Sequence, residues 1–454
     1  MSLLRQLESL DFKRVGVEQY DFVRELYPIC RSITGEGIRK TLELIRNRIP
    51  LRIHEVPSGT KVFDWLVPQE WNIRDAYIKT LSGDRLVDFR CCNLHVMSYS
   101  IPVRGIMTLE ELKPHLFTIP ETPDWIPYRT SYYKPAWGFC LSHNQMLSLE
   151  DREYEVCIDS DLKDGHLTYG EFYVAGKSEE EVLISCHACH PSLANDNLSG
   201  LTIAAYLAKV LSTMELHYSY RFIFIPGTIG AITWLSQNRD SAFKIQHGLV
   251  LTCLADAGSF HYKQSRRGNA DIDRAAAHVL AHHDKGAKIL DFFPYGYDER
   301  QYCSPGFNLP VGCLMRSVWG TFPEYHTSAD NLEFIRAEQL GDSLHVCVKI
   351  LDVLESNRRY ENQSPFCEPQ LGKRNLFRST GGSSIDAESH ARLWMLNLSD
   401  GNHSLLDIAE RSGMPFALLS AAAESLREAG LLKVLSNSDR TSESVNTSTR
   451  SPQS

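Results

Sequence analysis

Apolar and polar residues alternate in two different ways along this chain, and the clearer pattern begins near residue 153. From there, short apolar runs are followed by longer stretches whose apolar residues recur at helical spacing. The short runs are typical of buried strands and the longer stretches of amphipathic helices. Strands are predicted at 181–185, 220–225 and 247–256, and helices at 197–211, 230–238 and 337–355. Strands that alternate with helices predict an α/β domain with an open, mostly parallel sheet covered by helices.

The first third of the chain follows a different pattern. Residues 19–47 have helical spacing on either side of a turn at Gly35 and Gly37, which predicts two helices joined by a loop. Between 51 and 142 the apolar runs become short and alternating, with many turn residues and prolines. This pattern predicts an inserted β-rich domain at 51–142. The α/β domain is therefore expected to comprise residues 1–50 and 143–365.

Beyond residue 365 the pattern changes twice more. Residues 366–385 are polar and include paired glycines and serines, so they predict a linker. Residues 386–435 contain three helical segments and a strand-like end, which is typical of a winged helix. The last residues, 436–454, contain almost no apolar side chains and predict a disordered tail.

The charge of the chain argues against a nucleic-acid partner. The formal net charge is -9 and the sequence pI is about 6.0, so no broad cationic surface is expected for a polyanion. Between residues 386 and 433 there are seven acidic residues against four Lys or Arg, and acidic side chains on a reading helix repel phosphate. We therefore prefer a packing role for the winged helix, or a homo-oligomer formed through it, and expect a small-molecule or peptide substrate.

Two patterns bear on the location of the protein. The N-terminal residues interrupt their apolar positions with charged residues such as Arg5, Glu8 and Lys13, and so lack the continuous apolar region of a signal peptide. The most apolar stretch, 222–235, contains proline and glycine and is too short to cross a bilayer. The sequence therefore predicts a cytoplasmic protein without a membrane association.

The cysteines allow three interpretations of one short segment. Twelve cysteines are scattered irregularly, which without an export signal is more typical of reduced thiols than of a disulfide framework. Cys186, Cys189 and His190 match the Cys-x-x-Cys-His pattern of haem attachment, although covalent haem usually accompanies export. A redox dithiol is the second interpretation, but no thioredoxin-like pattern surrounds these residues. The third is a site that uses the histidines and Asp196.

Five residues with metal-binding side chains favour that third interpretation. His187, His190 and Asp196 follow the first predicted strand, Asp256 ends a later one, and His326 lies in "FPEYHTSADN". Because the carboxyl ends of parallel strands meet at one edge of a sheet, these side chains are expected to lie close together. A zinc site needs such ligands from several elements. A single histidine is more often a hydrogen-bonded core residue, so the joint placement carries the prediction.

Five sequence blocks resemble those of the zinc aminopeptidases in order and spacing. They are "VLISCH" with "ANDNLSG", "RFIFIPGTIG", "LVLTCLADAG", "GYDERQYCSPGFNLPVG" and "YHTSADNLEFI". The chain is more closely similar to the bacterial aminopeptidase-like domain proteins, which carry a small inserted β domain and a C-terminal winged helix and are often labelled polysaccharide-biosynthesis proteins. The resemblance extends over residues 17–435 and implies a zinc aminopeptidase-like α/β fold.

The resemblance also implies a role for each candidate ligand. His187 matches the first histidine ligand of the superfamily, Asp196 the metal-bridging aspartate and His326 the last histidine. Asp256 matches the later aspartate ligand. His190 has a counterpart in the closer family alone, where it would replace or assist His187.

Two positions depart from the aminopeptidase pattern. After the "RFIFIP" strand the peptidases place two glutamates, a general base and a ligand of a second metal, where this chain has Gly227 and Thr228. Threonine offers no carboxylate, so we expect one zinc ion rather than two. Glycine accepts no proton, so another carboxylate has to serve as the base. The candidates that flank the same pocket in the family are Asp298, Glu299 and Glu324.

The sequence thus predicts a zinc-dependent, aminopeptidase-like hydrolase that acts on an amide bond of a peptide or an aminoacyl small molecule. The rival hypothesis is a weakly catalytic or non-catalytic protein that binds a ligand or partner through the same pocket, because Gly227 removes the usual base. A regulator built on an inactive enzyme is a third hypothesis, which the acidic winged helix disfavours.

Overall fold

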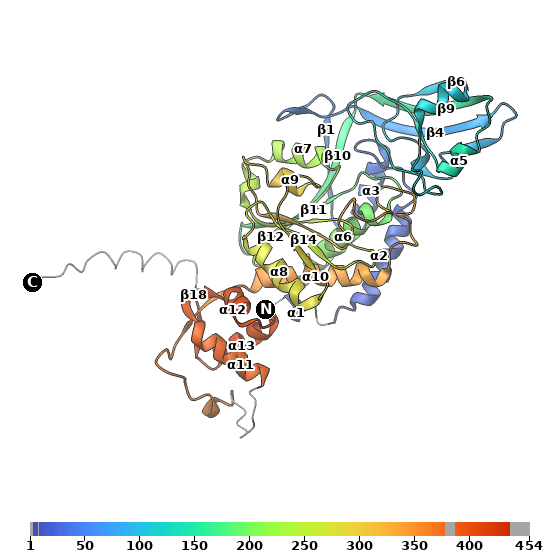
Figure 1. Cartoon of the computed structure of the whole chain (residues 1–454). Helices are drawn as coiled ribbons and strands as arrows, with labels where there is room; N and C mark the ends of the chain where they lie inside the picture. Colours follow the sequence, from blue (N-terminus) through green and yellow to red (C-terminus); the bar gives the residue numbers. More distant parts are fainter. Residues whose placement is uncertain (1–2, 8, 377–385, 436–454) are drawn as a thin grey trace, which may run out of the picture.

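The computed structural model describes residues 3–7, 9–376 and 386–435, and its centre is an eight-stranded sheet (Figure 1). Across the sheet the strands are, in order, β1 (Arg52–Pro57), β10 (His166–Val174), β12 (Ser219–Ile225), β11 (Glu181–His187), β13 (Ile245–Leu251), β16 (Val311–Met315), β14 (His261–Lys263) and β15 (Lys288–Leu290). The central strands from β12 to β16 are parallel, and antiparallel neighbours join them on both sides. The predicted α/β fold with a mostly parallel sheet is confirmed.

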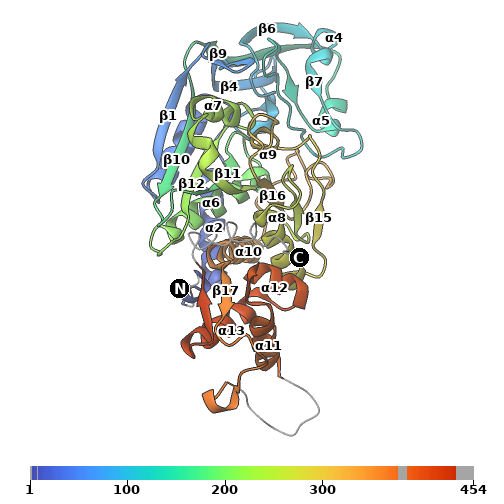
Figure 2. The ribbon, with the colours of Figure 1, turned by 90° about the vertical axis from the view of Figure 1, so that its left-hand side faces the viewer.

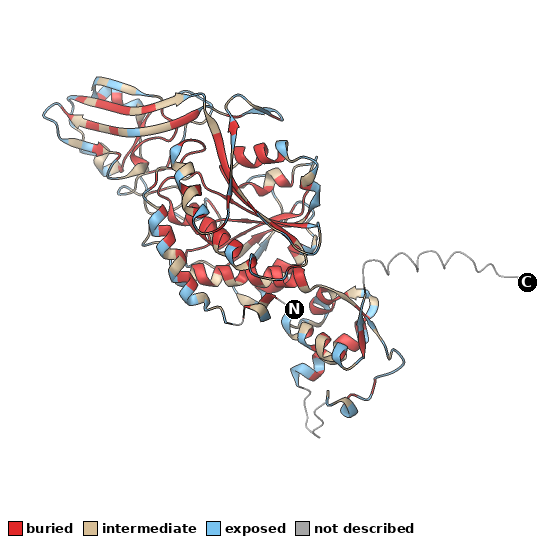
Figure 3. Ribbon diagram, turned by 180° about the vertical axis from the view of Figure 1, so that it is seen from behind, coloured by how far each residue is buried: buried red, intermediate tan, exposed pale blue. Residues whose placement is uncertain are grey.

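Helices cover both faces of this sheet because successive side chains of each strand point to opposite sides. Val182 and Ile184 of β11 belong to one buried core, whereas Leu183 belongs to the other. The first core includes residues of α1 (Leu3–Gln6), α2 (Phe12–Leu26), α3 (Glu36–Arg46), α6 (Gly200–Leu211), α8 (Asp271–His283) and α10 (Ala337–Ser356), and the second includes α7 (Ile229–Gln237) and α9 (Glu299–Tyr302). Figure 3 shows the buried residues running through the sheet and the inner faces of these helices. Within the described ranges, no helix has the length and apolar character needed to cross a membrane.

The inserted domain is built on a second, antiparallel sheet beside the first (Figure 1). Its strands are, in order, β5 (Arg85–Asp88), β4 (Glu70–Thr80), β9 (Glu153–Lys163) and β6 (Val103–Thr108). Shorter elements between β1 and β9 are β2 (Lys61–Val62), β3 (Trp65–Leu66), α4 (Leu109–Leu112), β7 (Leu116–Phe117), β8 (Phe139–Cys140) and α5 (His143–Leu147). The predicted boundaries of 51–142 need correction, because β1 pairs within the central sheet and β9 within the inserted one.

The C-terminal domain has the predicted winged-helix architecture. It contains α11 (Ala387–Leu398), α12 (Leu405–Ser412), α13 (Phe416–Glu428) and a sheet with the order β18 (Asp400–Ser404), β17 (Arg359–Asn362) and β19 (Leu432–Val434). Its predicted start at residue 386 is corrected, since β17 is the central strand of this sheet and lies within the segment assigned to the α/β domain. Residues 377–385 of the predicted linker and the predicted disordered tail, 436–454, lie outside the described residues.

The C-terminal domain packs against α8, on the side of the molecule away from the inserted domain (Figure 2). Arg274 of α8 forms ion pairs with Asp407 at 2.6 Å and Glu410 at 2.5 Å, both on α12. His278 of α8 accepts a hydrogen bond at 3.1 Å from the backbone N–H of Phe416. Phe416 is the first residue of α13, so the start of the predicted reading helix faces the α/β domain.

We predict that the contact between His278 and Phe416 weakens in mild acid. Burial, with the nearby His282, lowers the pKa of His278 to about 4, whereas a free histidine titrates near ~6.5. The undocked state therefore binds a proton that the docked state excludes. The contribution of neutral His278 to the stability of the docked state is therefore complete above pH ~6.5 and is lost as the pH falls towards ~4. Hydrogen exchange of α13 measured between pH 7.5 and 5 should show faster opening at the lower pH.

The His278→Gln variant keeps an acceptor at this position but does not titrate in this range. Its exchange in α13 is expected to depend less on pH than that of the wild type. His390→Gln is the matched control, because His390 lies exposed on α11. Equal pH dependence in His278→Gln and the wild type would contradict the prediction.

Candidate metal centre

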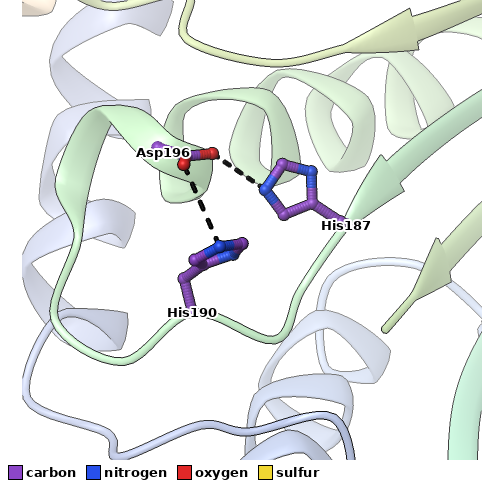
Figure 4. Close-up of side chains that lie close together, drawn as sticks. All are labelled: His187, His190 and Asp196. Atoms are coloured by element: carbon purple, nitrogen blue, oxygen red, sulfur yellow. Dashed lines mark hydrogen bonds and ion pairs between the residues drawn. The ribbon is translucent and has the colours of Figure 1, made fainter. Parts of the chain in front are cut away.

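The candidate ligands lie at the carboxyl edge of the parallel strands. His187 is the last residue of β11, His190 lies in the loop that follows, and Asp196 lies in the helical turn Ala194–Ser199 that leads into α6. His326 comes from the long connection between β16 and α10. Figure 4 shows the rings of His187 and His190 directed at the carboxylate of Asp196. The expected placement at the strand ends thus brings these side chains together.

One carboxylate is shared by three imidazoles. The Nε2 atom of His187 lies 2.8 Å from one oxygen of Asp196, and the Nε2 atom of His326 lies 3.0 Å from the other. The Nε2 atom of His190 is 4.0 Å from that second oxygen. His187, His190 and Asp196 each offer a ligand atom within 4.8 Å of the others. His187 and Asp196 are fully buried, while His326 is partly exposed.

The protonation states favour metal binding. Burial alone would raise the pKa of Asp196, but the imidazoles of His190 and His187 hold it well below its usual range. Burial lowers the pKa of His190 well below that of a free histidine, although Asp196 opposes the shift. Asp196 is therefore ionised and His190 neutral at physiological pH. These are the forms in which carboxylates and imidazoles bind metals.

Asp330 fixes the turn that carries Asp196, and the sequence alone did not reveal this. Its two carboxylate oxygens accept hydrogen bonds from the backbone N–H groups of Asn195 at 2.5 Å and Asp196 at 2.9 Å. Its backbone carbonyl accepts a third from Ala194. Burial raises the pKa of Asp330 to about 8, and the backbone N–H donors oppose that rise. The "ANDNLSG" and "YHTSADN" blocks are thus bonded directly to each other.

Tyrosine rings pack against all three histidines. Tyr297 stacks on His187 with ring centroids 4.4 Å apart, and Tyr325 stacks on His326 at 4.0 Å. The two tyrosine hydroxyls share a hydrogen bond of 2.9 Å. Tyr128 presents an edge-to-face contact to His326 at 5.1 Å and to His190 at 5.2 Å. Its backbone N–H also donates to the carbonyl of His326, so the inserted domain contributes directly to the site.

Arg31 supports the loop of His190 from the other side. Its Nε donates to the carbonyl of His190 at 2.8 Å, and its Nη1 donates to the carbonyl of Leu26 at the end of α2. Burial lowers the pKa of Arg31 to about 10, so the guanidinium is still charged at neutral pH. Arg31 belongs to the turn between α2 and α3, whose sequence had indicated only a connection between helices.

The carboxylate of Asp256, also a predicted ligand, lies in a hydrogen-bonded network. Its carboxylate accepts hydrogen bonds from the side chains of Asn195 at 2.8 Å and Ser317 at 2.6 Å, and from the backbone N–H of Gly258 at 2.7 Å. Among the described residues, the cluster of close ligand atoms consists of His187, His190 and Asp196 and does not include Asp256. Asn195 also accepts from the backbone N–H of Ala255. Asp256 therefore holds the turn before Asp196 in place from the loop after β13.

Gly227 lies beside His187 and Asp298. A Cβ atom at Gly227 would lie 3.1 Å from the Cβ of His187 and 3.5 Å from a carboxylate oxygen of Asp298. Asp298 is completely buried, and in the described part of the chain neither of its oxygens has a hydrogen-bond partner. Burial, with the nearby Glu299, raises its pKa well above the usual range. The structure thus brings a buried carboxyl to the position where the glutamate is missing.

The other two predicted bases are placed differently. Glu299 is fully buried and forms an ion pair of 2.8 Å with Lys263, which is buried as well. Breaking such a pair leaves an uncompensated charge, so Glu299 has a structural role. Glu324 is partly exposed, and its backbone carbonyl accepts hydrogen bonds from Thr327. Of the three candidates, Asp298 is the one that the structure places beside His187.

The two cysteines of the haem-like segment are buried thiols. Cys186 lies in the first core, and burial raises its pKa well above the usual range. Burial also raises the pKa of Cys189 to about 12. The Sγ of Cys189 lies 3.7 Å from the Nδ1 of His190 and 3.9 Å from the carbonyl oxygen of Gly227. Both sulfurs are therefore protonated at neutral pH in the metal-free protein, and among the described residues the candidate cluster does not include them.

The donor set fits zinc. Imidazole nitrogen and carboxylate oxygen are the ligands that zinc takes in catalytic sites. Three histidines and one aspartate would close a tetrahedral site, whereas three of these four side chains would leave a position open. His187 and His326 contact opposite oxygens of Asp196, and in the described part of the chain His326 lies outside the tight cluster of His187, His190 and Asp196.

The sheet, its helices and the cluster at the strand ends define an aminopeptidase-like protein. This fold is shared with the zinc aminopeptidase BSAP from Bacillus subtilis, with a TM-score of 0.53 and 12% identity over 74% of this chain and 94% of that one. The chain belongs to the family described as "Domain of unknown function (DUF4910)", which matches residues 20–357. Residues 358–434 match a winged helix-turn-helix family.

Two similar proteins come from Clostridium acetobutylicum. One, provisionally named a polysaccharide biosynthesis protein with aminopeptidase-like domain, is 54% identical over 421 residues, which are 92% of this chain and 97% of that protein. The other is a crystal structure provisionally described as a peptidase, with 51% identity and a TM-score of 0.91. It covers 95% of this chain and 100% of that one. The combination of an inserted domain and a winged helix is therefore a property of close relatives too.

We predict that His187→Ala and His326→Ala each lose zinc, because each removes a nitrogen that faces Asp196. Purified wild-type protein dialysed against metal-free buffer should keep about one zinc per chain. The variants should bind zinc at least ~10-fold more weakly, as measured by elemental analysis and competition with a chelating dye. Asp256→Asn should keep its zinc, since Asp256 lies outside the cluster.

His282→Ala is the matched control, because His282 is an exposed histidine of α8. It should bind zinc as the wild type does. His190→Ala tests whether His190 is a zinc ligand. Weaker zinc binding would indicate a site closed by all four side chains, whereas unchanged binding would indicate three ligands and one open position. Stoichiometric zinc with unchanged affinity in His326→Ala would exclude His326 as a ligand and leave the cluster of His187, His190 and Asp196 as the candidate site.

Proposed function

We propose that this protein is a zinc-dependent hydrolase that cleaves an amide bond of a peptide or an aminoacyl small molecule. The proposal rests on one observation above all: a fully buried carboxyl, Asp298, lies beside the histidine cluster with no hydrogen-bond partner among the described residues. Hydrolysis of an amide adds the hydroxyl of water to the carbonyl carbon and a proton to the departing nitrogen. The site therefore needs a group that moves protons.

Asp298 has the environment of such a group. Buried carboxyls whose pKa rises towards neutrality are the ones that enzymes use for proton transfer, and burial raises the pKa of Asp298. It reaches the space beside Gly227 from the loop before α9, whereas the aminopeptidase glutamate would come from the end of β12. We propose that Asp298 takes over the proton-transfer role of that glutamate.

The remaining residues of the site would hold the metal ion and orient its ligands. Zinc at such a site acts as a Lewis acid that polarises a carbonyl and makes a nearby water more acidic. His187, His326 and Asp196, with His190, would hold the ion. Tyr297, Tyr325 and Tyr128 fix the histidine rings and exclude water around them.

A second candidate function is ligand binding without turnover. Gly227 favours it, since a general base is absent from the usual position. Zinc-loaded protein that binds amides without cleaving them would support this candidate. We retain hydrolysis as the first proposal because a fully buried carboxyl without a partner lowers the stability of the protein. A role in catalysis explains why such a costly group is present.

A small-molecule or peptide substrate also agrees with the position of the winged helix. The start of α13 and the acidic residues of α12 contact α8. A nucleic acid would have to displace this contact before it reached the start of α13. We therefore propose no nucleic-acid partner, and the homo-oligomer through the winged helix stays a prediction.

We predict that zinc-loaded protein hydrolyses aminoacyl anilides, that chelation abolishes the activity and that zinc restores it. Asp298→Asn should lower kcat by about 10²–10⁴ with little change in zinc content, because the amide keeps the shape but accepts no proton. Because one Clostridium acetobutylicum relative is named for polysaccharide biosynthesis, the substrate panel should include amino-sugar amides.

Glu324→Gln tests the competing base and should retain most of the activity. Asp291→Asn is the control for removing an exposed carboxylate from the same segment. Full activity in Asp298→Asn would overturn the role of Asp298. Stoichiometric zinc with no turnover on any amide would favour the binding function instead.

A further inference from the structure

A groove lined with aromatic side chains lies between the inserted segment and the α/β domain. Its volume is about 400 Å³, and one wall is the hairpin β2–β3, with Phe63 and Trp65. The opposite walls are α7, through Ile232, and the loop after α9, through Phe307. None of these residues belongs to the cluster around Asp196.

A smaller, inner cavity lies beside this groove. Trp65 and Ile232 line both spaces, so the two spaces are neighbours that these side chains separate. The inner cavity has a volume of about 100 Å³, and Gly227 and Thr228 lie in its wall. Gly227 is the neighbour of His187 and Asp298. The inner cavity thus borders the backbone next to the candidate centre.

The aromatic rings of the groove are unusually open to solvent. Phe63 is 45% exposed, Trp65 46% and Tyr133 50%. Trp65 packs against Tyr133 with ring centroids 5.3 Å apart, and Phe63 against Phe307 at 5.9 Å. Clusters of exposed aromatic rings mark binding surfaces, because the folded chain gains no stability from rings that stay in water.

The backbone conformation of Phe63 also indicates a binding role for its ring. Phe63 has a φ of +56° at the tip of a two-residue hairpin loop. Glycine and asparagine take this left-handed conformation readily, whereas a bulky residue takes it at a cost in free energy. A phenylalanine kept at this position is more easily explained by what its ring contacts than by the turn itself.

Polar side chains stand between the rings. Asp64, Arg239, Gln301 and Ser304 line the same groove. A purely apolar ligand would leave these groups without partners, which costs binding energy. A pyranose ring satisfies both requirements, since its C–H faces stack on aromatic rings and its hydroxyls bond to carboxylate, guanidinium and amide groups.

We infer that this groove binds a saccharide, and that the amide substrate of the protein carries a sugar. The sugar lies between the hairpin β2–β3 and Phe307, and the amide-bearing arm points towards the inner cavity beside Gly227. The statement about the substrate rests on the proposed amide hydrolysis, whereas saccharide binding by the groove does not. The hairpin β2–β3 thus acts as a specificity element.

Binding to the zinc-loaded full chain tests the inference without requiring turnover. The probe is N,N′-diacetylchitobiose, followed by saturation-transfer NMR and calorimetry, neither of which depends on Trp65 as a reporter. We expect binding by the wild type, about tenfold weaker binding by Trp65→Ala, and weaker binding by Arg239→Ala, which removes a polar partner from the same groove. Phenylalanyl-leucine amide is the comparison ligand and should bind without dependence on Trp65.

Ile106→Ala is the matched control, because Ile106 is an exposed apolar residue of β6 in the inserted domain and lies outside the groove. It should bind the disaccharide as the wild type does. Binding of the dipeptide amide alone, with loss in Trp65→Ala, would overturn the inference in favour of a peptide groove. Absence of disaccharide binding, or binding unchanged in both groove variants, would overturn it as well. Saccharide binding without amide cleavage would leave the groove assigned and refute the proposed hydrolysis alone.

Discussion

The hydrogen bonds of Asp330 to the backbone of Asn195 and Asp196 are the constraint on which the candidate site depends. They connect two segments more than a hundred residues apart in the chain and set the direction of the Asp196 carboxylate. Asn195, held in the same turn, bonds to Asp256 in the loop after β13. The shared carboxylate of Asp196 can face three histidines only because this frame fixes the turn before α6.

The sequence predicted the features that follow from local pattern and from the geometry of parallel strands. β11 and β12 are buried on both faces, so they appear as continuous apolar runs, and their ends had to meet at one edge of the sheet. His187, Asp196 and His326 could be chosen on that ground. The predicted domain boundaries were wrong at strands whose pairing partner decides which sheet they join. The residues of β9 have the same alternation whichever strand they pair with.

For several predicted site residues the sequence did not reveal the role, because distant contacts set it. Asp256 matched a ligand by position, but whether its carboxylate faces an ion or Asn195 depends on side chains from other elements. Asp298 and Glu299 are adjacent in sequence and equally buried, yet one pairs with Lys263 and the other has no partner in the described structure. No pattern within the chain separates them. In the same way, the solvent exposure of Trp65 depends on where its hairpin lies.

The burial of Cys189 has a consequence for the reactivity of the haem-like segment. With its pKa raised to about 12, the thiol keeps its proton next to His190 at neutral pH, whereas the thiolate is the nucleophilic form of cysteine. The same burial protects the sulfur from alkylating reagents and peroxide. The thiols of the haem-like segment are thus expected to react slowly with such reagents.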